Sequence, residues 1–446
     1  MTVSRNAHAD HNRQLAVELA KRYNGEVING DAMQLYAGLP VITNKIVVEE
    51  QQGIPHHLLG CIKLQEQTWV VGTFVKKALS VIDEIRSRGK VPILVGGTHY
   101  YLQGLLFREQ LAEPEEQQDV KSFVNDTSET WPALKEDTPR LMEELRKVDP
   151  IMADRWHPND RRKIQRSLEI YFQTGRRASD IYADQRKLKA EEGEANKDGG
   201  VPSAGCSLRF PTLLFWIHAE NEALNRRLEN RVDKMLAAGL LDEVRMLDTF
   251  VTAEAMDGRP VDETRGIWVS IGYKEFKGYM HALQAGNASD KELAKLRSEA
   301  LERTKAATRQ YAKRQIRWIR IKLLHTLDSA NAGNSLYLLD GTQVSNFDPH
   351  VVETASDLTH SFLTAASPLP EPKSLSPVAA EMLTPKRDYD YAAQPEKWLK
   401  KHCELCGTTC VTEDQWAMHV KSKAHRKLVS KRRKADGEAK SAHTPG

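Results

Sequence analysis

Two apolar strand patterns separated by an amphipathic helix constrain the fold of this chain more than any other feature. Residues 26–29 form a short strand pattern that ends in Gly30 and Asp31, and residues 91–95 form a nearly continuous apolar run. Between them, residues 74–88 place apolar side chains at helical spacing. A continuous apolar strand is typical of a parallel sheet that is covered on both faces. The order strand, helix, strand therefore predicts an α/β fold built on a doubly wound parallel sheet.

Composition narrows the class of protein further. The chain has 446 residues, with 64 Lys and Arg, 61 Asp and Glu, and 5 cysteines. The cysteines are too few for a disulfide framework, which favours a reducing compartment. No apolar stretch approaches the ~20 residues that a membrane span needs, and the first residues lack the apolar segment of a secretion signal. We therefore expect no membrane association, and a cytoplasmic, mitochondrial or nuclear protein.

The sharpest local signal is the spacing Cys403-x2-Cys406-x12-His419-x5-His425. Two thiolates and two imidazoles at this spacing predict a tetrahedral zinc site, with the histidines on a helix. A module this small has little core, so zinc would supply most of its folding free energy. A chance grouping of cysteines and histidines is the alternative, and Cys410 lies outside the pattern. The five-residue gap resembles the matrin or U1-type finger, a class associated with RNA.

A second group of residues follows the predicted strands of the α/β core. Asp31 lies just past the first strand, and Gly96, Gly97 and Thr98 lie just past the second. The carboxyl ends of parallel strands border one ligand crevice. Paired glycines let backbone N–H groups approach an anion, and Asp31 could take a proton or position a metal. A simple turn at the glycines and a helix-capping aspartate are the alternatives.

Two predicted helices carry clustered positive charge. Residues 160–175 form a helix pattern with capping residues at both ends, and Arg162, Lys163 and Arg166 fall together on its solvent face. Residues 304–320 form another basic helix pattern, interleaved with aromatic residues, which suits phosphates and stacked bases. An ordinary solvated helix face is the alternative for each.

Longer runs of sequence follow one another in a recognisable order. They are residues 25–36, 42–45, 53–57, 95–102 (Val-Gly-Gly-Thr-His-Tyr-Tyr-Leu), 157–160, 165–166, 169–171, 174–175, 230–235, 266–268, 270–275 and 308–315 (Thr-Arg-Gln-Tyr-Ala-Lys-Arg-Gln). Together these runs resemble the eukaryotic tRNA dimethylallyltransferases, also called tRNA isopentenyltransferases. The resemblance covers about residues 14–325, and the zinc finger fits the eukaryotic branch.

The resemblance implies a P-loop NTPase-like core and a specific reaction. A dimethylallyl group passes from its diphosphate, which is bound with Mg²⁺, to N6 of the adenosine 3′-adjacent to the tRNA anticodon. The catalytic residues that it implies are Asp31, as the base for the N6 proton, Thr98, and Arg231 at the leaving diphosphate. The residues that it assigns to the tRNA anticodon stem-loop are Asp31, Ala32, Met33, Gln34, Thr98, Arg162, Lys163, Ile164, Gln165 and Arg166. Lys163 stands where the family usually has arginine, which keeps the charge but loses the fork geometry.

One departure from the family concerns the diphosphate site. The family opens with an apolar strand and a loop of the form Gly-x-Thr-x-x-Gly-Lys-Ser/Thr, directly before the helix that here starts near Gln14. Residues 1–11 are polar and lack glycine, and Asn12 and Arg13 stand at the lysine and hydroxyl positions. We therefore expect the central strand to be missing, through truncation or in an inactive tRNA-binding paralogue. We favour truncation, because the other functional segments are intact. The absent loop argues against an unrelated phosphate-loop kinase or NTPase.

The predicted organisation follows from these assignments. An α/β catalytic core with a helical extension spans residues 1–137 and 208–330. It contains a helical tRNA-binding insertion at 138–186 and a polar loop at 187–207. A linker at 331–398 leads to the zinc finger at 399–430, and a disordered basic tail at 431–446 follows. We expect a monomer.

Overall fold

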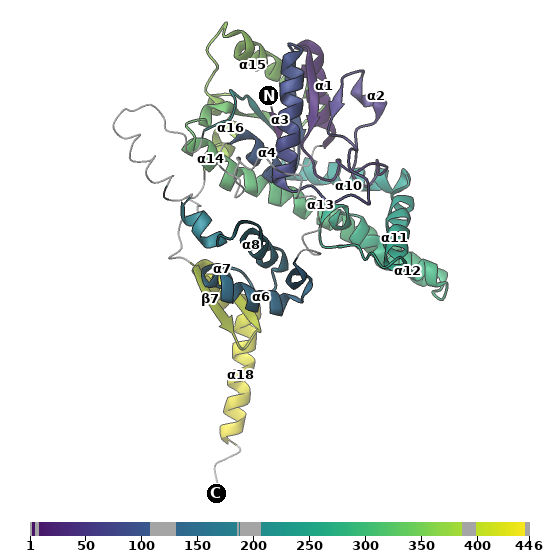
Figure 1. The fold of residues 1–446 in the computed structure, drawn as a ribbon, viewed down its shortest axis with the longest axis vertical. Coiled ribbons are helices and arrows are strands. Elements are labelled where there is room, and N and C mark those ends of the chain that lie inside the picture. The colour runs from purple at the N-terminus through teal and green to yellow at the C-terminus, as the bar shows by residue number, and fades with distance from the viewer. Residues whose placement is uncertain are drawn as a thin grey trace. The chain divides into compact units, whose positions relative to one another are not determined.

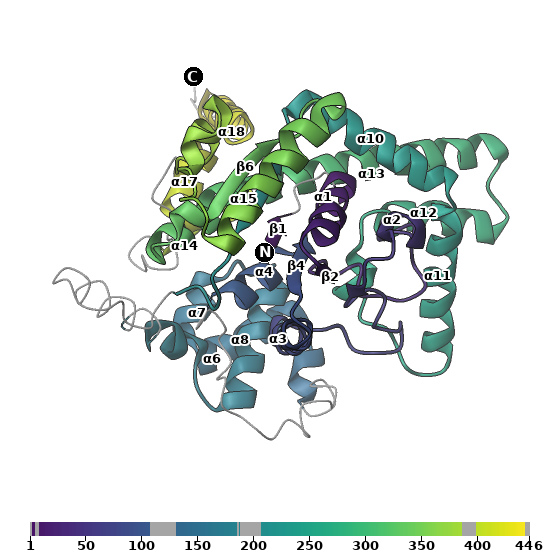
Figure 2. The ribbon, with the colours of Figure 1, turned by 90° about the horizontal axis from the view of Figure 1, so that it is seen from above.

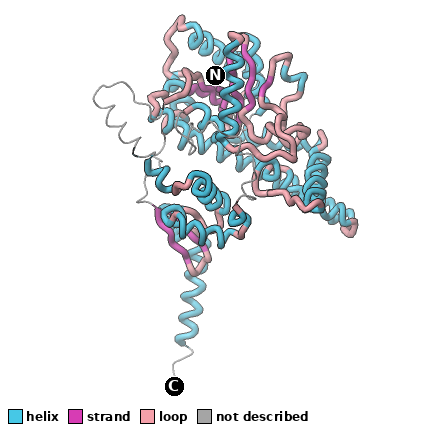
Figure 3. The backbone as a smooth tube through the Cα atoms, viewed as in Figure 1, coloured by secondary structure: helices cyan, strands magenta, loops and turns pink. Residues whose placement is uncertain are grey.

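The computed structural model describes residues 2–4, 9–107, 131–184, 187, 207–385 and 398–441. The chain divides into two compact units, which are Met1–Leu111 with Cys206–Tyr389, and Ala112–Gly205 with Asp390–Gly446. Helix is the predominant element (Figure 3). Within the described residues, no helix combines the length and the apolar character that a membrane span requires.

The first unit is built on a six-stranded sheet in the order β3-β2-β4-β1-β5-β6. The strands are β1 (Thr2–Ser4), β2 (Gly25–Asn29), β3 (His56–His57), β4 (Val91–Gly96), β5 (Leu214–His218) and β6 (Leu336–Asp340), and every pairing is parallel. The strands predicted over residues 26–29 and 91–95 are β2 and β4, in register from Gly25 opposite Val91 to Asn29 opposite Val95. This arrangement confirms the predicted α/β fold.

Helices cover both faces of the sheet (Figure 2). On one face, α1 (Ala9–Arg22) and α15 (Glu353–Thr364) bury apolar side chains such as Leu19 and Leu358 in one core. On the other face, α3 (Val71–Ser87) and α4 (His99–Leu106) pack in a second core that includes Phe74 and Leu102. The apolar residues of α3 recur at helical spacing and are buried, as the pattern over 74–88 predicts.

The first unit contains further helices and short helical turns. They are α2 (Val48–Gln51), α10 (Asn221–Ala237), α11 (Leu240–Met256), α12 (Tyr273–Ala285), α13 (Asp290–Trp318), α14 (Leu324–Ser329), α16 (Pro377–Met382), the π-helical turns Ile319–Leu323 and Asp348–Val352, and the 3₁₀ turns Gly266–Val269, Gly333–Ser335, Val344–Asn346 and Pro372–Ser374. Ser289 and Glu292 form a capping box that begins α13. The predicted basic helix over 304–320 is the second half of α13 and the start of the π-helical turn.

Ion pairs hold the start of β2. The carboxylate of Glu26, which is 2% exposed, accepts hydrogen bonds from His57 at 2.6 Å, Arg88 at 2.7 Å and Lys90 at 2.8 Å. Burial by itself raises the pKa of Glu26, but these three hydrogen bonds outweigh burial and lower the pKa to about 2. The ionised carboxylate therefore ties together the segments that carry β2, β3 and β4.

The expectation that the central strand is missing was wrong. Residues Thr2–Ser4 form β1, which pairs with Leu94–Gly96 of β4 and with Leu214–Trp216 of β5. Backbone pairing needs only an extended segment, and Thr-Val-Ser has a suitable β-propensity. The polar sequence after β1 still lacks the glycines and the lysine of a phosphate loop.

The linker predicted over 331–398 was also wrong for most of its length. Residues Leu336–Asp340 form β6, whose first four side chains are buried, and α15 and α16 follow. The short apolar run at 336–339 is a covered parallel strand. Prolines in this segment occupy first helical positions, as Pro377 does in α16, where they do not break the helix. Residues 386–397 lie outside the described structure.

The second unit combines a helical bundle with the finger (Figure 1). The bundle comprises the 3₁₀ turn Pro132–Lys135 and helices α6 (Thr138–Val148), α7 (Pro150–Arg155) and α8 (Arg161–Thr174). The finger comprises β7 (Trp398–Cys403), β8 (Thr408–Thr412), α17 (Glu413–Lys421) and α18 (Lys423–Ser441), with β7 and β8 antiparallel. Nζ of Lys400 in β7 donates to the carbonyl oxygen of Ala153 in α7 at 2.9 Å. Finger and bundle therefore contact each other directly.

The structure describes most of the predicted tail but almost none of the predicted polar loop. The tail predicted as disordered over 431–446 is helical as far as Ser441, because α18 continues through it. Its residues are mostly Lys, Arg, Ala and Glu, which favour helix. The polar loop predicted over 187–207 lies outside the described residues, apart from Lys187 and Ser207.

Candidate functional sites

A tight turn fixes Asp31 at the carboxyl end of β2. Oδ1 of Asp31 accepts a hydrogen bond from the backbone N–H of Met33 at 2.9 Å. The backbone N–H of Asp31 donates to Oδ1 of Asn29 at 3.0 Å, and Nδ2 of Asn29 donates back to the carbonyl oxygen of Asp31 at 3.1 Å. Asn29 is 4% exposed and also binds the carbonyl oxygen of Leu58 at 2.8 Å. The carboxylate of Asp31 is therefore held in one orientation.

The structure brings Thr98 against the Asp31 turn, as the strand order predicts. Oγ1 of Thr98 accepts a hydrogen bond from the backbone N–H of Ala32 at 2.9 Å. The backbone N–H of Thr98 donates to the carbonyl oxygen of Gly30 at 3.3 Å. Although Thr98 precedes α4, its hydroxyl does not cap that helix. The hydroxyl is used instead to join the two strand ends.

This junction depends on glycine at position 96. A Cβ atom built on Gly96 would lie 2.3 Å from the carbonyl carbon and oxygen of Gly30. Such a contact involves backbone, which cannot rotate away as a side chain can. Glycine is therefore required where the end of β4 approaches the backbone of Gly30, directly after β2.

We expect Gly96→Ala to lower the free energy of unfolding by at least ~2 kcal/mol, because the added methyl group forces two backbone segments apart. The measurement is the urea midpoint of the full chain. Gly278→Ala in α12 is the matched control: nothing lies within 4 Å of the added methyl group, and we expect it to stabilise by about 0.5–1 kcal/mol. A Gly96→Ala variant as stable as the wild type would contradict the close approach of the Gly96 and Gly30 backbones.

Helix α13 supports the loop that carries Thr98. Nε2 of Gln315, which is 5% exposed, donates to the carbonyl oxygen of Gly97 at 2.9 Å, and the hydroxyl of Tyr311 donates to the same oxygen at 3.4 Å. The ring of His99 stacks on Trp318 with centroids 4.4 Å apart. Burial lowers the pKa of His99 to about 4, so its ring is neutral near pH 7. The sequence does not predict the contact between Gln315 and Gly97. The four-residue spacing of Gln315 from Tyr311 indicates only that both side chains lie on the same face of the helix.

Gln34 anchors a neighbouring loop. Nε2 of Gln34 donates to the carbonyl oxygens of Thr43 at 3.3 Å and Asn44 at 3.1 Å, and its side chain is 5% exposed. The side chains of Ala32 and Met33 are partly buried against the same core. Contact of these residues with RNA stays a prediction.

Asn12 and Arg13, which stand where the family has the lysine and the hydroxyl residue of its phosphate loop, are buried or bonded within the protein. Asn12 is 0% exposed. Nη1 of Arg13 donates to the carbonyl oxygen of Asn44 at 2.6 Å, and Nη2 lies 3.7 Å from Oε2 of Glu50. A guanidinium offers only donors, so Arg13 cannot ligate a magnesium ion. Arg13, at the position of the hydroxyl residue, therefore does not fit the metal.

Arg231 lies on α10, with its Nε atom buried. Helix α10 packs on α13 through Leu224, Leu228 and Ala312. Because α13 also contacts Gly97, the two helices link Arg231 to the Thr98 loop. Its role at a diphosphate stays a prediction.

In the second unit, α8 begins and ends as predicted. Asp160 caps it by accepting from the backbone N–H of Lys163, and Gly175 follows with φ 68°. Arg162 and Lys163 are exposed, while Gln165 and Arg166 are half-buried. Lys163 pairs with Asp160 at 2.9 Å, and Arg166 with Glu169 at 3.4 Å.

Ile164 is the exception among the residues assigned to RNA on α8. It is 0% exposed and packs in the apolar core of the bundle with Leu168 and Leu141. Its position on the helix faces inward, so its side chain cannot reach a ligand. Its contribution is to hold α8 in place.

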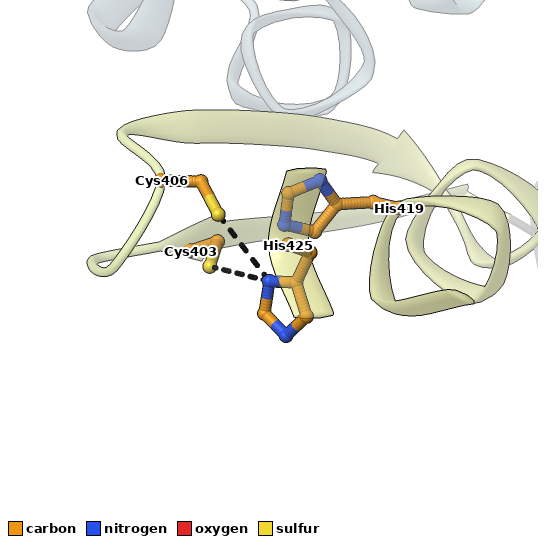
Figure 4. A group of neighbouring side chains, drawn as sticks. All are labelled: Cys403, Cys406, His419 and His425. Carbon is orange, nitrogen blue, oxygen red and sulfur yellow. Dashed lines mark hydrogen bonds between the residues drawn. The ribbon is translucent and has the colours of Figure 1, made fainter. Parts of the chain in front are cut away.

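The four predicted metal ligands meet in the finger (Figure 4). Cys403 ends β7, Cys406 lies in the following turn, His419 is on α17 and His425 is on α18. Their ligand atoms all lie within 4.8 Å of one another. Sγ of Cys406 is 3.3 Å and Sγ of Cys403 is 3.7 Å from Nδ1 of His425, and Nε2 of His419 is buried with no hydrogen-bond partner in the described structure. Two sulfur and two nitrogen atoms at these separations fit a tetrahedral zinc ion.

Two known protein families match parts of this chain. The family described as IPP transferase matches residues 34–322. The chain belongs to this family. The zinc-finger family of C2H2 type matches residues 401–425, which contain all four metal ligands.

Individual members of the IPP transferase family match along nearly the whole chain. The tRNA dimethylallyltransferase of Schizosaccharomyces pombe is 35% identical over 94% of this chain and 92% of its own length. The human tRNA dimethylallyltransferase is 32% identical over 95% of this chain and 85% of its own length. A crystal structure of a eukaryotic dimethylallyltransferase acting on tRNA superimposes with a TM-score of 0.73 and 30% identity, covering 98% of both chains.

Proposed function

We propose that this protein is a tRNA dimethylallyltransferase, which transfers a dimethylallyl group to N6 of the adenosine 3′-adjacent to the anticodon. The observation that carries the proposal is the junction of Asp31 and Thr98 at the carboxyl ends of β2 and β4. It places an oriented carboxylate where a parallel sheet binds ligands. The relatives named above act on tRNA, which supports the assignment of the substrate.

The proposed reaction needs one base and one group for the leaving anion. The N6 nitrogen attacks the allylic carbon, the carbon–oxygen bond breaks, and diphosphate leaves with the bonding electron pair. Asp31 takes the proton that N6 loses. Arg231 would balance the charge of the diphosphate, while Thr98 holds the Asp31 turn in place. The adenosine must leave the base stack to reach this site.

Recognition of the tRNA is proposed for both units. In the first unit, residues 31–34 and Thr98 would contact the anticodon stem-loop around the extruded base. In the second unit, the exposed charges of α8 would contact phosphates. We propose zinc as the structural ion of the finger. Mg²⁺ would enter only with the diphosphate substrate, and no step is assigned to it because Arg13 cannot hold it. We also propose a monomer that works in the cytosol, the mitochondrion or the nucleus.

The test is transfer of label from dimethylallyl diphosphate to tRNA by the purified full chain. Accumulation of label in tRNA supports the proposal. The alternative is a catalytically inactive tRNA-binding paralogue, which the glycine-free sequence after β1 favours. That alternative predicts tRNA binding without transfer at any enzyme concentration.

The basic face of α8 gives a separate prediction. We expect Arg162→Ala combined with Arg166→Ala to weaken tRNA binding and to reduce the slope of log K against log salt. The slope should fall by about 0.7 to 0.9 for each lost phosphate contact. Titrations at several salt concentrations measure this. Arg245→Ala, which removes an exposed arginine on α11, is the control and should leave the slope unchanged. An unchanged slope in the double variant would mark α8 as an ordinary solvated helix.

A further inference from the structure

Buried nitrogen atoms gather at the carboxyl ends of the two strands beside β1. We call His99, Trp216, His218, Trp318 and Arg320 the donor cluster. Each has a buried side-chain nitrogen without a hydrogen-bond partner in the described structure, and Arg320 has two, Nε and Nη2. Polar atoms in protein interiors are nearly always paired, so a concentration of unpaired polar nitrogens indicates a ligand.

The members of the donor cluster are neighbours. The rings of His99 and Trp318 are stacked at 4.4 Å, and those of Trp216 and His218 meet edge to face at 6.1 Å. Arg320 acts electrostatically on His218. Trp216 also shares an apolar core with Ile319, which lies between Trp318 and Arg320 in the chain.

Arg320 is the member of the donor cluster with the most unpaired buried nitrogen atoms. Arg320 is half-buried as a residue, but its Nε and Nη2 atoms are buried, so these N–H groups lose water without gaining a partner in the described chain. Arg227 in the same unit differs, because its guanidinium donates to the carbonyl oxygens of Gly341 and Thr342. The acidic residues Glu220, Asp340 and Glu381 act on His218, and none of them forms an ion pair with Arg320 within the described chain.

The place of the donor cluster suggests which anion it takes. His99 follows β4, His218 ends β5, and β1 lies between these strands. In folds of this kind phosphate groups bind at the carboxyl ends of strands, above the turn that leads to the next helix. Residues 5–8, which follow β1 in the sequence, contain neither the glycines nor the lysine of a phosphate loop. A phosphate-loop lysine therefore does not supply positive charge for a diphosphate. The π-helical turn that carries Arg320 supplies it beside the Thr98 loop.

We propose that Arg320, assisted by the indole N–H groups of Trp216 and Trp318, binds the diphosphate group of the prenyl donor. This proposal rests on the function proposed above and adds, to Arg231, a second residue that binds the leaving group. Arginine matches the oxygens of a phosphate with its fork of donors, and indole N–H groups can only donate. The buried position of these nitrogens favours a small anion over the backbone of an RNA.

The test uses the full chain with two probes, inorganic pyrophosphate and a tRNA anticodon stem-loop, in calorimetric titrations. Arg320→Met keeps the apolar stem and removes the charge, whereas Arg320→Lys keeps the charge and removes the fork. Arg297→Met, an exposed site on α13, is the control. We expect Arg320→Met to weaken pyrophosphate binding by roughly tenfold or more, Arg320→Lys to fall between, and the control to match the wild type. Binding of the stem-loop should change less than about twofold.

A second readout separates binding from a structural role. Because Arg320→Met removes two buried N–H groups that have no partner in the described chain, the ligand-free variant should melt no lower than the wild type. Pyrophosphate should raise the melting temperature of the wild type and not of the variant. Equal pyrophosphate affinity in wild type and Arg320→Met, loss of the stem-loop instead of pyrophosphate, or no binding of pyrophosphate by the wild type would each overturn the proposal.

Transfer activity of the wild type, measured separately, distinguishes this inference from the proposed function. Arg320-dependent binding of pyrophosphate without any prenyl transfer would leave the anion site standing and defeat the transferase assignment. Prenyl transfer by the wild type together with unchanged pyrophosphate binding in Arg320→Met would support the transferase assignment and defeat the anion site.

Discussion

Asp31→Asn should reduce the rate of prenyl transfer by about 10²–10⁴-fold, because the amide cannot take the proton that N6 releases. The substitution keeps the shape of the side chain, and its oxygen can still accept from the backbone N–H of Met33. The turn should therefore remain folded. Affinity for tRNA comes mainly from phosphate contacts and should be nearly unchanged. The measurement is single-turnover transfer at saturating tRNA, with tRNA affinity determined in parallel.

The control for this variant is Asp83→Asn on the exposed face of α3, which should leave the rate unchanged. An undiminished rate for Asp31→Asn would remove Asp31 from the chemical step. Loss of tRNA binding instead of rate would assign Asp31 to recognition of RNA.

Cys403→Ser should lower bound zinc from about one equivalent to about none and unfold the finger, because metal binding supplies most of the folding free energy of so small a module. Cys403 is 6% exposed and its Sγ faces His425. Zinc content is measured by elemental analysis of the purified chain. Cys410→Ser is the matched control within the same hairpin: Cys410 is 4% exposed but lies outside the ligand group, so zinc should stay near one equivalent.

We expect Cys403→Ser to lower the affinity for tRNA and to leave the rate of prenyl transfer unchanged. The hydrogen bond from Lys400 to Ala153 joins the finger to the bundle that carries α8, so loss of the finger should weaken tRNA binding. The finger offers no carboxylate for the N6 proton in the proposed mechanism. Transfer from bound tRNA should therefore proceed at the wild-type rate. A loss of transfer at saturating tRNA would place the finger in the active site.

Local patterns explain which parts of the structure could be predicted from the sequence. The strands β2 and β4 have apolar runs long enough to identify, and α8 has capping residues at both ends. The zinc ligands follow from spacing alone, since one short module contains all four. The meeting of Asp31 and Thr98 follows from the rule that parallel strands end at one edge of a sheet.

Elements defined by tertiary contacts escaped prediction. β1 has only three residues and exists through its pairing with β4 and β5. β6 is a short apolar run in a segment that also contains several prolines. Because prolines are typical of linkers, the sequence pattern favoured a linker over a strand. The position of Gln315 against Gly97 joins residues 218 apart in the chain, and no local pattern reports such a contact.

The most direct test of the central claim is to locate the modified nucleoside. The purified chain is incubated with dimethylallyl diphosphate and a tRNA that has adenosine 3′-adjacent to its anticodon, and the products are mapped by nuclease digestion and mass spectrometry. A matched tRNA with guanosine at that position serves as the control. We predict N6-dimethylallyladenosine at that single position and no modification of the control. Unmodified tRNA in both reactions, despite measurable tRNA binding, would contradict the account and identify the protein as a tRNA-binding paralogue without transferase activity.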